Sequence, residues 1–339
     1  KDELAGEEKQ LRANMHPLVS KVTQGKPLVL WERLLRESGF QDVEVVADHM
    51  AKDVELVGLE PNSMIYEKKY QPLLTTPQQL VAQSKWRRKA TMLRPATDEE
   101  MEQAARLSEE CAKEVELGFL SGPFDSEQAV SDFLQTDDWT LNKRFLLLQG
   151  EEQKPRVIDN CRDSGVNEAF GSSSYLALHD TDFLAGFLRY VSTTLACQDE
   201  VVVHLSTGEV LRGRWHPEMG TSPAFLGRCI DLSKAYKQVA VAPGSIHHGV
   251  LGHRTSDGGW QFHVSRSLPF GATAAVFSFN KISRGLWHLM THELGLLSGV
   301  FYDDFPVIEV EPLQQLTTML VGTFLDLMGW QHATVGKKA

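Results

Sequence analysis

Short apolar runs bounded by glycine, proline and polar residues alternate along the chain with longer stretches of helical periodicity. The short runs predict a strand over residues 145–148 before Gly150, and hairpins over residues 201–213 and through Gly258-Gly259. The longer stretches predict helices over residues 97–117, 272–294 and 313–328. Strands and helices mixed in this way predict an α+β fold.

The N-terminal part, residues 1–140, is predicted to be mainly helical, and the sequence assigns no chemistry to it. Residues 1–60 combine short helical patterns with a candidate strand, around residues 31–35 and 43–46. Residues 61–77 are predicted to be loop and linker, because prolines interrupt regular structure there.

Two adjacent acids, Asp303 and Asp304, lie between two apolar runs in residues 299–308. This pattern predicts a β-hairpin with both acids at its turn, because neighbouring side chains in a regular strand point to opposite faces. Carboxylates near an apolar core are costly unless a cation lies beside them, and a hard divalent cation is the simplest partner. A solvated turn, in which Asp is common, is the alternative.

Composition indicates a globular protein with a substantial core, since 42% of the 339 residues are hydrophobic and 23% are charged. The net charge of −11 is unusual for a protein that binds nucleic acid. Most of the acidity is N-terminal: residues 1–140 carry 17 basic and 26 acidic side chains, whereas residues 141–339 carry 17 and 19. The charge therefore does not exclude nucleic-acid binding by the C-terminal part.

The four cysteines, Cys111, Cys161, Cys197 and Cys229, are far apart in the sequence. This spacing argues against a zinc site and a disulfide framework, and indicates a reducing compartment. No apolar run approaches the ~20 residues that cross a membrane, and we expect an intracellular protein, cytoplasmic or nuclear, with no membrane partner. Because the sequence begins with Lys1 rather than Met, we expect a fragment or a processed product.

Three basic residues lie in the segment that follows Gly150. Lys154 lies in a turn, Arg156 on a strand and Arg162 beyond it, where they could meet phosphates by charge-assisted hydrogen bonds. Salt bridges at strand ends are the alternative. A dense basic cluster at residues 85–89 fits either a nucleic-acid backbone or a solvated helix face.

Three further motifs follow in order. Residues 228–231 are a predicted strand that ends at Asp231 before the start of a helix; Leu268-Pro269-Phe270-Gly271 precedes the helix over residues 272–294; Phe301-Tyr302-Asp303-Asp304 follows that helix. The series resembles the palm of reverse transcriptases over about residues 145–339, and Arg156 to Asn167 resembles their fingers motif. The Leu-Pro-Phe-Gly form is closer to retrotransposon enzymes than to intron-encoded ones.

The resemblance implies a right-hand polymerase fold, with fingers and an antiparallel palm sheet flanked by helices. Residues 141–227 would form a fingers-like segment with an inserted hairpin, and residues 228–339 the catalytic palm, with the thumb absent. The chain departs from the family pattern after Gly271. Family members often have a proline a few residues after this glycine, whereas this chain has Ala272-Thr273-Ala274-Ala275. Because a thumb normally grips the primer duplex, we expect residues 1–339 alone to polymerise poorly.

The resemblance also implies a set of site residues. The catalytic residues and metal ligands are Asp231, Asp303 and Asp304, which would hold two Mg²⁺ ions, or Mn²⁺ in their place. The nucleotide-binding residues are Lys154, Arg156, Arg162, Leu232, Tyr236, Gln238 and Gly271. The template–primer contacts are Leu268, Pro269, Phe270, Asn280 and Tyr302.

Three of these residues have structural alternatives. Gln238 and Asn280 are polar among apolar neighbours and fit satisfied core amides equally well. Tyr236 would lie beneath the incoming sugar and exclude a 2′-hydroxyl, and a core aromatic that anchors the following helix is its alternative.

The implied function is RNA-directed DNA polymerisation, a nucleotidyltransferase reaction that adds dNTPs to a primer 3′-hydroxyl on an RNA or DNA template. An inactive, palm-derived relic that binds nucleic acid is one alternative. An RNA-dependent RNA polymerase is another, but those enzymes usually carry a second Asp where this chain has Tyr236, and their third motif usually begins with Gly. The sequence leaves open the template preference, the retroelement class, the oligomeric state and the role of residues 1–140.

Overall fold

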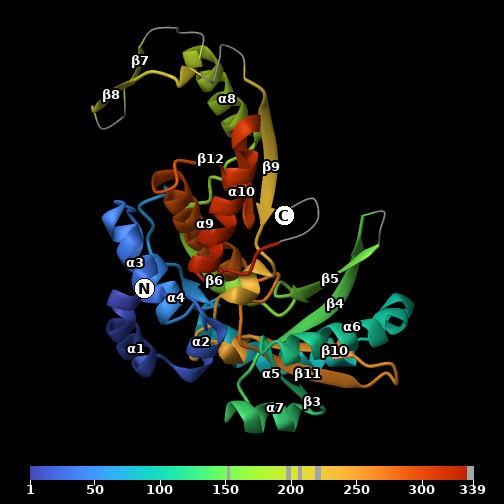
Figure 1. Ribbon diagram of the computed structural model, residues 1–339. Coiled ribbons are helices and arrows are strands. Elements are labelled where there is room, and N and C mark those ends of the chain that lie inside the picture. Colours follow the sequence, from blue (N-terminus) through green and yellow to red (C-terminus); the bar gives the residue numbers. More distant parts are fainter. Residues whose placement is uncertain (151–152, 196–199, 205–207, 218–222, 334–339) are drawn as a thin grey trace. The chain divides into compact units, whose positions relative to one another are not determined.

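The computed structural model describes residues 1–150, 153–195, 200–204, 208–217 and 223–333 of an α+β protein (Figure 1). Its chain forms two compact units, each built from separate pieces of the sequence. The first unit contains Lys1–Ala177, Lys234–Gly285 and Met328–Gln331, and the second contains Leu178–Ser233, Leu286–Leu327 and His332–Ala339. One long helix, α9 (Thr273–His292), contributes residues to both units.

The N-terminal part of the first unit is helical, as predicted. It comprises η1 (Asp2–Leu4), α1 (Ala5–Asn14), α2 (Pro17–Val22), α3 (Leu28–Glu37) and α4 (Val43–Ala51). The candidate strand around residues 43–46 is wrong, because Val43, Val46 and Met50 are buried at helical spacing on one face of α4. A short run of β-branched residues does not distinguish the two structures, and burial of one face selects the helix.

A small sheet in the first unit has the strand order β1-β6-β2. It combines β1 (Gly58–Leu59), β2 (Glu67–Gln71) and β6 (Phe170–Tyr175), and β1 runs parallel to β6. Strand β2 lies within residues 61–77, so the prediction of a loop throughout that segment is wrong. All five β2 residues are exposed, and their sequence has no apolar alternation that could have revealed the strand.

A five-stranded mixed sheet forms the centre of the first unit, with the order β3-β11-β10-β4-β5. Its strands are β3 (Leu120–Phe124), β4 (Leu141–Gln149), β5 (Lys154–Asn160), β10 (Val250–Arg254) and β11 (Trp260–Ser265). Strand β10 is parallel to β4, and the other neighbours are antiparallel. The predicted strand before Gly150 and the hairpin through Gly258-Gly259 are confirmed.

Three helices belong to the same part of the first unit: α5 (Pro77–Leu93), α6 (Asp98–Glu116) and α7 (Glu127–Leu134). A capping box of Thr97 and Glu100 begins α6. Leu107 and Cys111 of α6 pack with Leu146 of β4, so this amphipathic helix buries its apolar face against the sheet.

The second unit contains a three-stranded antiparallel sheet of order β12-β13-β9. Its elements are α8 (Thr181–Leu195), β7 (Val201–His204), β8 (Val210–Gly213), β9 (Phe225–Asp231), β12 (Leu297–Ser298), β13 (Asp304–Val310), η6 (Glu311–Leu313) and α10 (Gln314–Leu327). The pairing of β7 with β8 confirms the hairpin predicted over residues 201–213, although residues 205–207 lie outside the described residues. The two C-terminal helices are confirmed as α9 and α10.

The helix predicted to start after Asp231 is only a single 3₁₀ turn, η4 (Ala235–Gln238). Lys234, which precedes it, has a φ of 51° and lies in the left-handed region. That conformation prevents a right-handed helix from continuing through residue 234, and after η4 the chain is extended at Val239.

Arg144 of β4 carries a charge in the interior of the first unit, where its side chain is 1% exposed. Its guanidinium binds Asp159 of β5, with Nε–Oδ1 at 2.7 Å, and Glu114 of α6, with Nη1–Oε2 at 3.0 Å. Burial favours the neutral form of Arg144, but Asp159 and Glu114 outweigh it and raise the pKa of the guanidinium. Burial likewise opposes ionisation of Glu114, but Lys237 and Arg144 lower its pKa to about 2.

Replacing Arg144 by Met should destabilise the protein by about 3–5 kcal/mol at pH 7, because the buried Asp159 carboxylate loses its ion-pair partner and Glu114 keeps only Lys237. The folded-state pKa of Glu114 lies below its ordinary value of 4.5, so its stabilising contribution is present above that value and is lost as the pH falls toward about 2. The deficit of Arg144→Met should therefore shrink over that range.

Urea unfolding of the wild type and the variant, followed by circular dichroism, measures this difference. Arg33→Met is the control, because Arg33 forms an ion pair with Glu37 on an exposed helix face and its loss should have no measurable effect. A deficit no larger for Arg144→Met than for the control would show that the buried charges do not support the fold.

Candidate active site

The backbones of the three candidate acids lie at one end of the β9–β13 pair. Asp231 is the last residue of β9 and lies directly opposite Asp304, the first residue of β13. Directly opposed residues share one face of a sheet, and alternation places the buried residues Ile230 and Phe305 on the other face. The sheet therefore keeps its apolar face in the core and presents Asp231 and Asp304 together.

Asp303 lies in the tight turn that joins the two halves of the hairpin. Phe301 and Asp304 exchange two backbone hydrogen bonds of 2.8 and 3.0 Å, leaving Tyr302 and Asp303 as the turn residues. Tyr302 has a φ of 56°, a left-handed conformation that is rare for an aromatic residue. The N–H of Leu232 donates to the carbonyl of Asp303 at 3.4 Å, so the turn is also attached to the end of β9.

The opposition of Asp231 and Asp304 has an electrostatic cost. Like charges at directly opposed positions destabilise an antiparallel pair, and both side chains are half-buried rather than fully solvated. A divalent cation would remove this cost, and carboxylate oxygens are the ligands that Mg²⁺ prefers. Residue type, half-exposure and shared face are compatible with a Mg²⁺ site, and that site stays a prediction.

A histidine that the sequence did not single out attaches the other half of the hairpin. His179 donates its backbone N–H to the carbonyl of Val300 at 3.1 Å, and its Nδ1 accepts from the Val300 N–H at 3.2 Å. Its ring is stacked on Phe183 and meets Trp287 edge-on. His179 precedes α8 and lies far from the acids in sequence, so spacing gave no signal of this role.

Asp159 and Asn167 attach the Leu-Pro-Phe-Gly motif by hydrogen bonds within the first unit. Asp159 donates its N–H to the carbonyl of Phe270, and its carboxylate accepts from the Phe270 N–H. Asn167 bonds both the carbonyl of Gly271 and the N–H of Thr273 at the start of α9. A Cβ at Gly271, where φ is 133°, would collide with the Asp159 carbonyl, so only glycine fits there.

Within this motif, Leu268 and Pro269 are buried, whereas Phe270 is 38% exposed. Tyr236 is buried against Phe270 and Phe279, with ring centroids 5.7 and 4.7 Å away. The Tyr236 ring therefore has the packing expected of the core-aromatic alternative.

Gln238 and Asn280 are both buried amides with hydrogen-bond partners. Gln238 accepts from the Lys26 ammonium at 2.9 Å and exchanges two bonds with the backbone of Gln331. Asn280 donates to the carbonyl of Val276 within its own helix at 2.7 Å. These surroundings match the core-amide alternative for both residues, and the proposed function does not use either residue as a substrate contact.

The predicted phosphate-binding residues Lys154, Arg156 and Arg162 are all exposed. Lys154 and Arg156 are two positions apart on β5 and share a face, whereas the residue on the opposite face, Asp159, is buried with Arg144. The basic cluster at residues 85–89 is different, because it combines an exposed Trp86 with a buried Arg88 that lies over the Trp139 ring.

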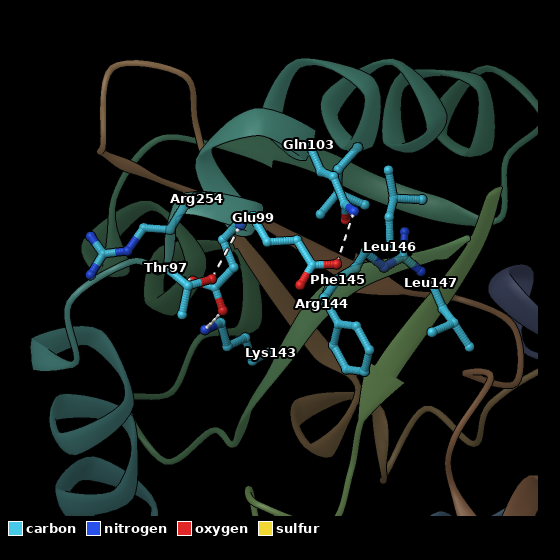
Figure 2. Close-up of a pocket in the computed structure, with 11 residues that line it drawn as sticks. Thr97, Glu99, Gln103, Lys143, Arg144, Phe145, Leu146, Leu147 and Arg254 are labelled. Carbon is cyan, nitrogen blue, oxygen red and sulfur yellow. Dashed lines mark hydrogen bonds and ion pairs between the residues drawn. The ribbon is translucent and has the colours of Figure 1, made fainter. Parts of the chain in front are cut away.

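A cavity of about 240 Å³ lies between α6 and β4 in the first unit (Figure 2). It is lined by Thr97, Glu99, Glu100, Gln103, Leu107, Lys143, Arg144, Phe145, Leu146, Leu147 and Arg254. Its charged walls are internally paired, since Lys143 bonds Glu100 and Arg144 bonds Glu114. None of the three acids lines it, and it adds nothing to the candidate active site.

Comparison with protein-family models gives no match for this chain, and comparison with curated proteins gives none either. The resemblance to reverse transcriptases therefore rests on the motifs alone. Among the described residues, no helix has the length and apolar character needed to cross a membrane.

Replacing Asp304 by Asn should raise the melting temperature in the absence of divalent cations by about 1–3 °C, because it relieves repulsion from Asp231. Excess Mg²⁺ should stabilise the wild type more than the variant, since a ligand that binds only the folded state raises its stability.

Differential scanning calorimetry in EDTA and in Mg²⁺ measures both effects. Asp182→Asn, which removes an exposed acid near the start of α8 in the same unit, is the control for the loss of one charge. Equal stabilisation of the wild type and Asp304→Asn by Mg²⁺ would contradict a metal site at the opposed acids.

Proposed function

We propose that this chain catalyses template-directed DNA synthesis, adding deoxynucleotides to a primer 3′-hydroxyl on an RNA or DNA template. The observation that carries the proposal is the register of β9 and β13, which sets Asp231 opposite Asp304 with Asp303 in the adjoining turn. The acids come from two motifs 72 positions apart in the first and third places of a series that resembles the reverse transcriptase palm. The register supports the proposal because it places acids of both motifs at the same end of one strand pair.

Asp231, Asp303 and Asp304 would be the ligands of Mg²⁺, or of Mn²⁺ in its place. When bound, such ions activate the attacking hydroxyl and neutralise the leaving pyrophosphate. The chain supplies the charge and its placement. The Leu232–Asp303 and Phe301–Asp304 backbone bonds fix the turn that carries two of the acids, and fixed ligands need no reorganisation during the reaction.

The proposal assigns phosphate binding to the exposed basic residues of the first unit. Lys154 and Arg156 on one face of β5, with Arg162 beyond it, would form charge-assisted hydrogen bonds to the nucleotide or the nucleic-acid backbone. Within the described part of the chain, these three side chains form no hydrogen bond or ion pair. They therefore differ from Arg144 and Arg88, whose charges are used within the fold.

The inactive relic remains a second candidate, because family motifs persist without catalysis when a site is no longer used. Retention of all three acids favours the enzyme. An RNA polymerase is less favoured, since Tyr236 replaces the acid that would meet a ribose hydroxyl.

The decisive experiment is addition of one nucleotide to a primed RNA or DNA template, with enzyme in excess and Mg²⁺ or Mn²⁺ present. Single addition does not require the protein to stay on the template. Asp231→Asn and Asp303→Asn should each lower the rate by about 10²–10³-fold, because transition-state charge loses its stabilisation. Template–primer binding should be retained.

Asp182→Asn is again the control and should leave the rate unchanged. Binding of template–primer by the wild type without any addition would support the relic instead. Near-normal addition by Asp303→Asn would remove the acids from the mechanism.

Tyr236→Val tests the choice of sugar. If the ring excludes a 2′-hydroxyl, the ratio of ribonucleotide to deoxyribonucleotide incorporation should rise by about 10-fold or more. Tyr236→Phe keeps the ring and should leave the ratio unchanged. Melting temperatures of both variants are needed, because the ring packs on Phe270 and Phe279; an equal loss of both substrates in Tyr236→Val would show that the residue only packs.

A further inference from the structure

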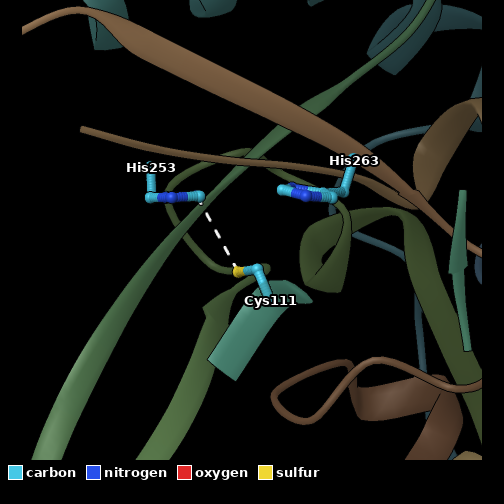
Figure 3. A group of neighbouring side chains, drawn as sticks. All are labelled: Cys111, His253 and His263. Atoms are coloured by element: carbon cyan, nitrogen blue, oxygen red, sulfur yellow. Dashed lines mark hydrogen bonds between the residues drawn. The ribbon is translucent and has the colours of Figure 1, made fainter. Parts of the chain in front are cut away.

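A group of side chains that could hold a metal ion lies in the first unit, apart from the acids in sequence. It consists of Cys111 on α6, His253 on β10 and His263 on β11, whose ligand atoms all lie within 4.8 Å of one another (Figure 3). The cysteine spacing argued against a zinc site, but folding brings one cysteine to two histidines that are more than 140 positions away.

The sheet explains why the two histidines meet. His263 lies opposite Leu251 in the β10–β11 ladder, and His253 is two residues beyond Leu251, so both imidazoles project from the same face. Their rings are stacked with centroids 5.7 Å apart. Cys111 faces them from α6, and its Sγ lies 3.9 Å from His253 Nδ1.

The hydrogen bonding of the group is incomplete in a way that suits a metal. His263 is 1% exposed, and its Nδ1 is buried without a hydrogen-bond partner, which is unusual for a buried polar atom. His253 bonds Ser108 Oγ through Nε2 at 3.0 Å, which leaves Nδ1 directed toward Cys111. A partner side chain on the second ring nitrogen commonly orients a metal-binding histidine.

The local charges are compatible with a cation. Burial raises the pKa of the Cys111 thiol, and this shift is opposed by Arg144, whose Nη1 lies 3.5 Å from Sγ. Its own charge is compensated by Asp159 and Glu114.

We propose that Cys111, His253 and His263 bind one thiophilic divalent ion of the Zn²⁺ class. Thiolate and imidazole ligands select such an ion over Mg²⁺. Tetrahedral zinc has Zn–S and Zn–N distances of about 2.3 and 2.0–2.1 Å, so the ligand atoms need to approach one another by only about 1 Å. The bound ion joins α6 to the β10–β11 hairpin, and its fourth ligand is a water molecule.

An entry route is provided by the cavity between α6 and β4. Leu107 and Leu146 line that cavity and also pack with Cys111, so the cavity ends on the neighbours of the thiol. Movement of these two apolar side chains is enough to admit an ion.

The test uses residues 1–339 after treatment with a chelator under reducing conditions. Co²⁺ is the spectroscopic probe, because it replaces Zn²⁺ and a cobalt–thiolate bond gives a charge-transfer absorption. We expect one equivalent of Co²⁺ to produce that absorption together with visible bands of tetrahedral cobalt. Zn²⁺ should displace the cobalt, whereas Mg²⁺ should not.

Cys111→Ser should abolish the charge-transfer absorption, and His263→Gln should weaken Co²⁺ binding by about 100-fold or more. Cys161→Ser, which replaces another buried cysteine of the same unit, should leave both unchanged. Circular dichroism establishes that each variant is folded; if Cys111→Ser is not, His263→Gln and His253→Gln decide the outcome.

Absence of the absorption in the folded wild type would overturn the proposal and leave Cys111 and the histidines as a packed, metal-free group. Its persistence in Cys111→Ser or in both histidine variants would do the same. Because these measurements do not involve Asp231, Asp303 or nucleic acid, their result is independent of the proposed polymerase activity.

Discussion

Asp159 holds together three parts of the first unit. Its carboxylate binds Arg144 on the neighbouring strand and accepts a hydrogen bond from the Phe270 N–H, and its own N–H donates to the Phe270 carbonyl. The side chain has no exposure to solvent, so separating these parts would leave a buried charge without a partner. Strands β4 and β5 and the turn before α9 are therefore fixed relative to one another. Residue 271 must be glycine because a Cβ there would collide with the Asp159 carbonyl.

In the second unit the corresponding constraint is register. Side chains alternate with a period of two, so a slip of one residue between β9 and β13 would move Asp304 from beside Asp231 and place the acid against core residues. Burial of Ile230, Phe305 and Val307 on the opposite face resists that slip. The apolar residues thus determine where the acids lie, although they have no part in the proposed chemistry.

Patterns that depend on nearby residues were predictable from the sequence. The hairpins and the three long helices follow from local periodicity, and the acid doublet lies at a hairpin turn as its flanking apolar runs indicated. The polar strand β2 was not predictable, because it is exposed along its length and pairs through its backbone. The hydrogen-bond partners of Gln238 and Asn280 match the core-amide alternative, which their sequence positions did not distinguish. Tyr236 packs in the core, and its role in choosing the sugar stays a prediction.

Contacts between residues far apart in the chain could not be predicted from the sequence for a different reason. The attachment of Val300 by His179 and the approach of Cys111 to two histidines depend on elements that only the complete topology brings together. The Leu268-Pro269-Phe270-Gly271 motif indicates a family resemblance in the sequence. In the fold, hydrogen bonds to Asp159 and Asn167 hold this motif and the start of α9 in place.

The segment Met328–Gln331 belongs to the first unit, and it contacts residues near the beginning of the sequence. The Lys26 ammonium donates to the Gly329 carbonyl, 303 residues away, and Trp31 packs against Trp330. During synthesis on a ribosome, the N-terminal helices would therefore emerge long before their partners exist. Trp31 would remain without Trp330 until about 300 further residues are made, so this unit cannot finish folding while residues 328–331 are still untranslated.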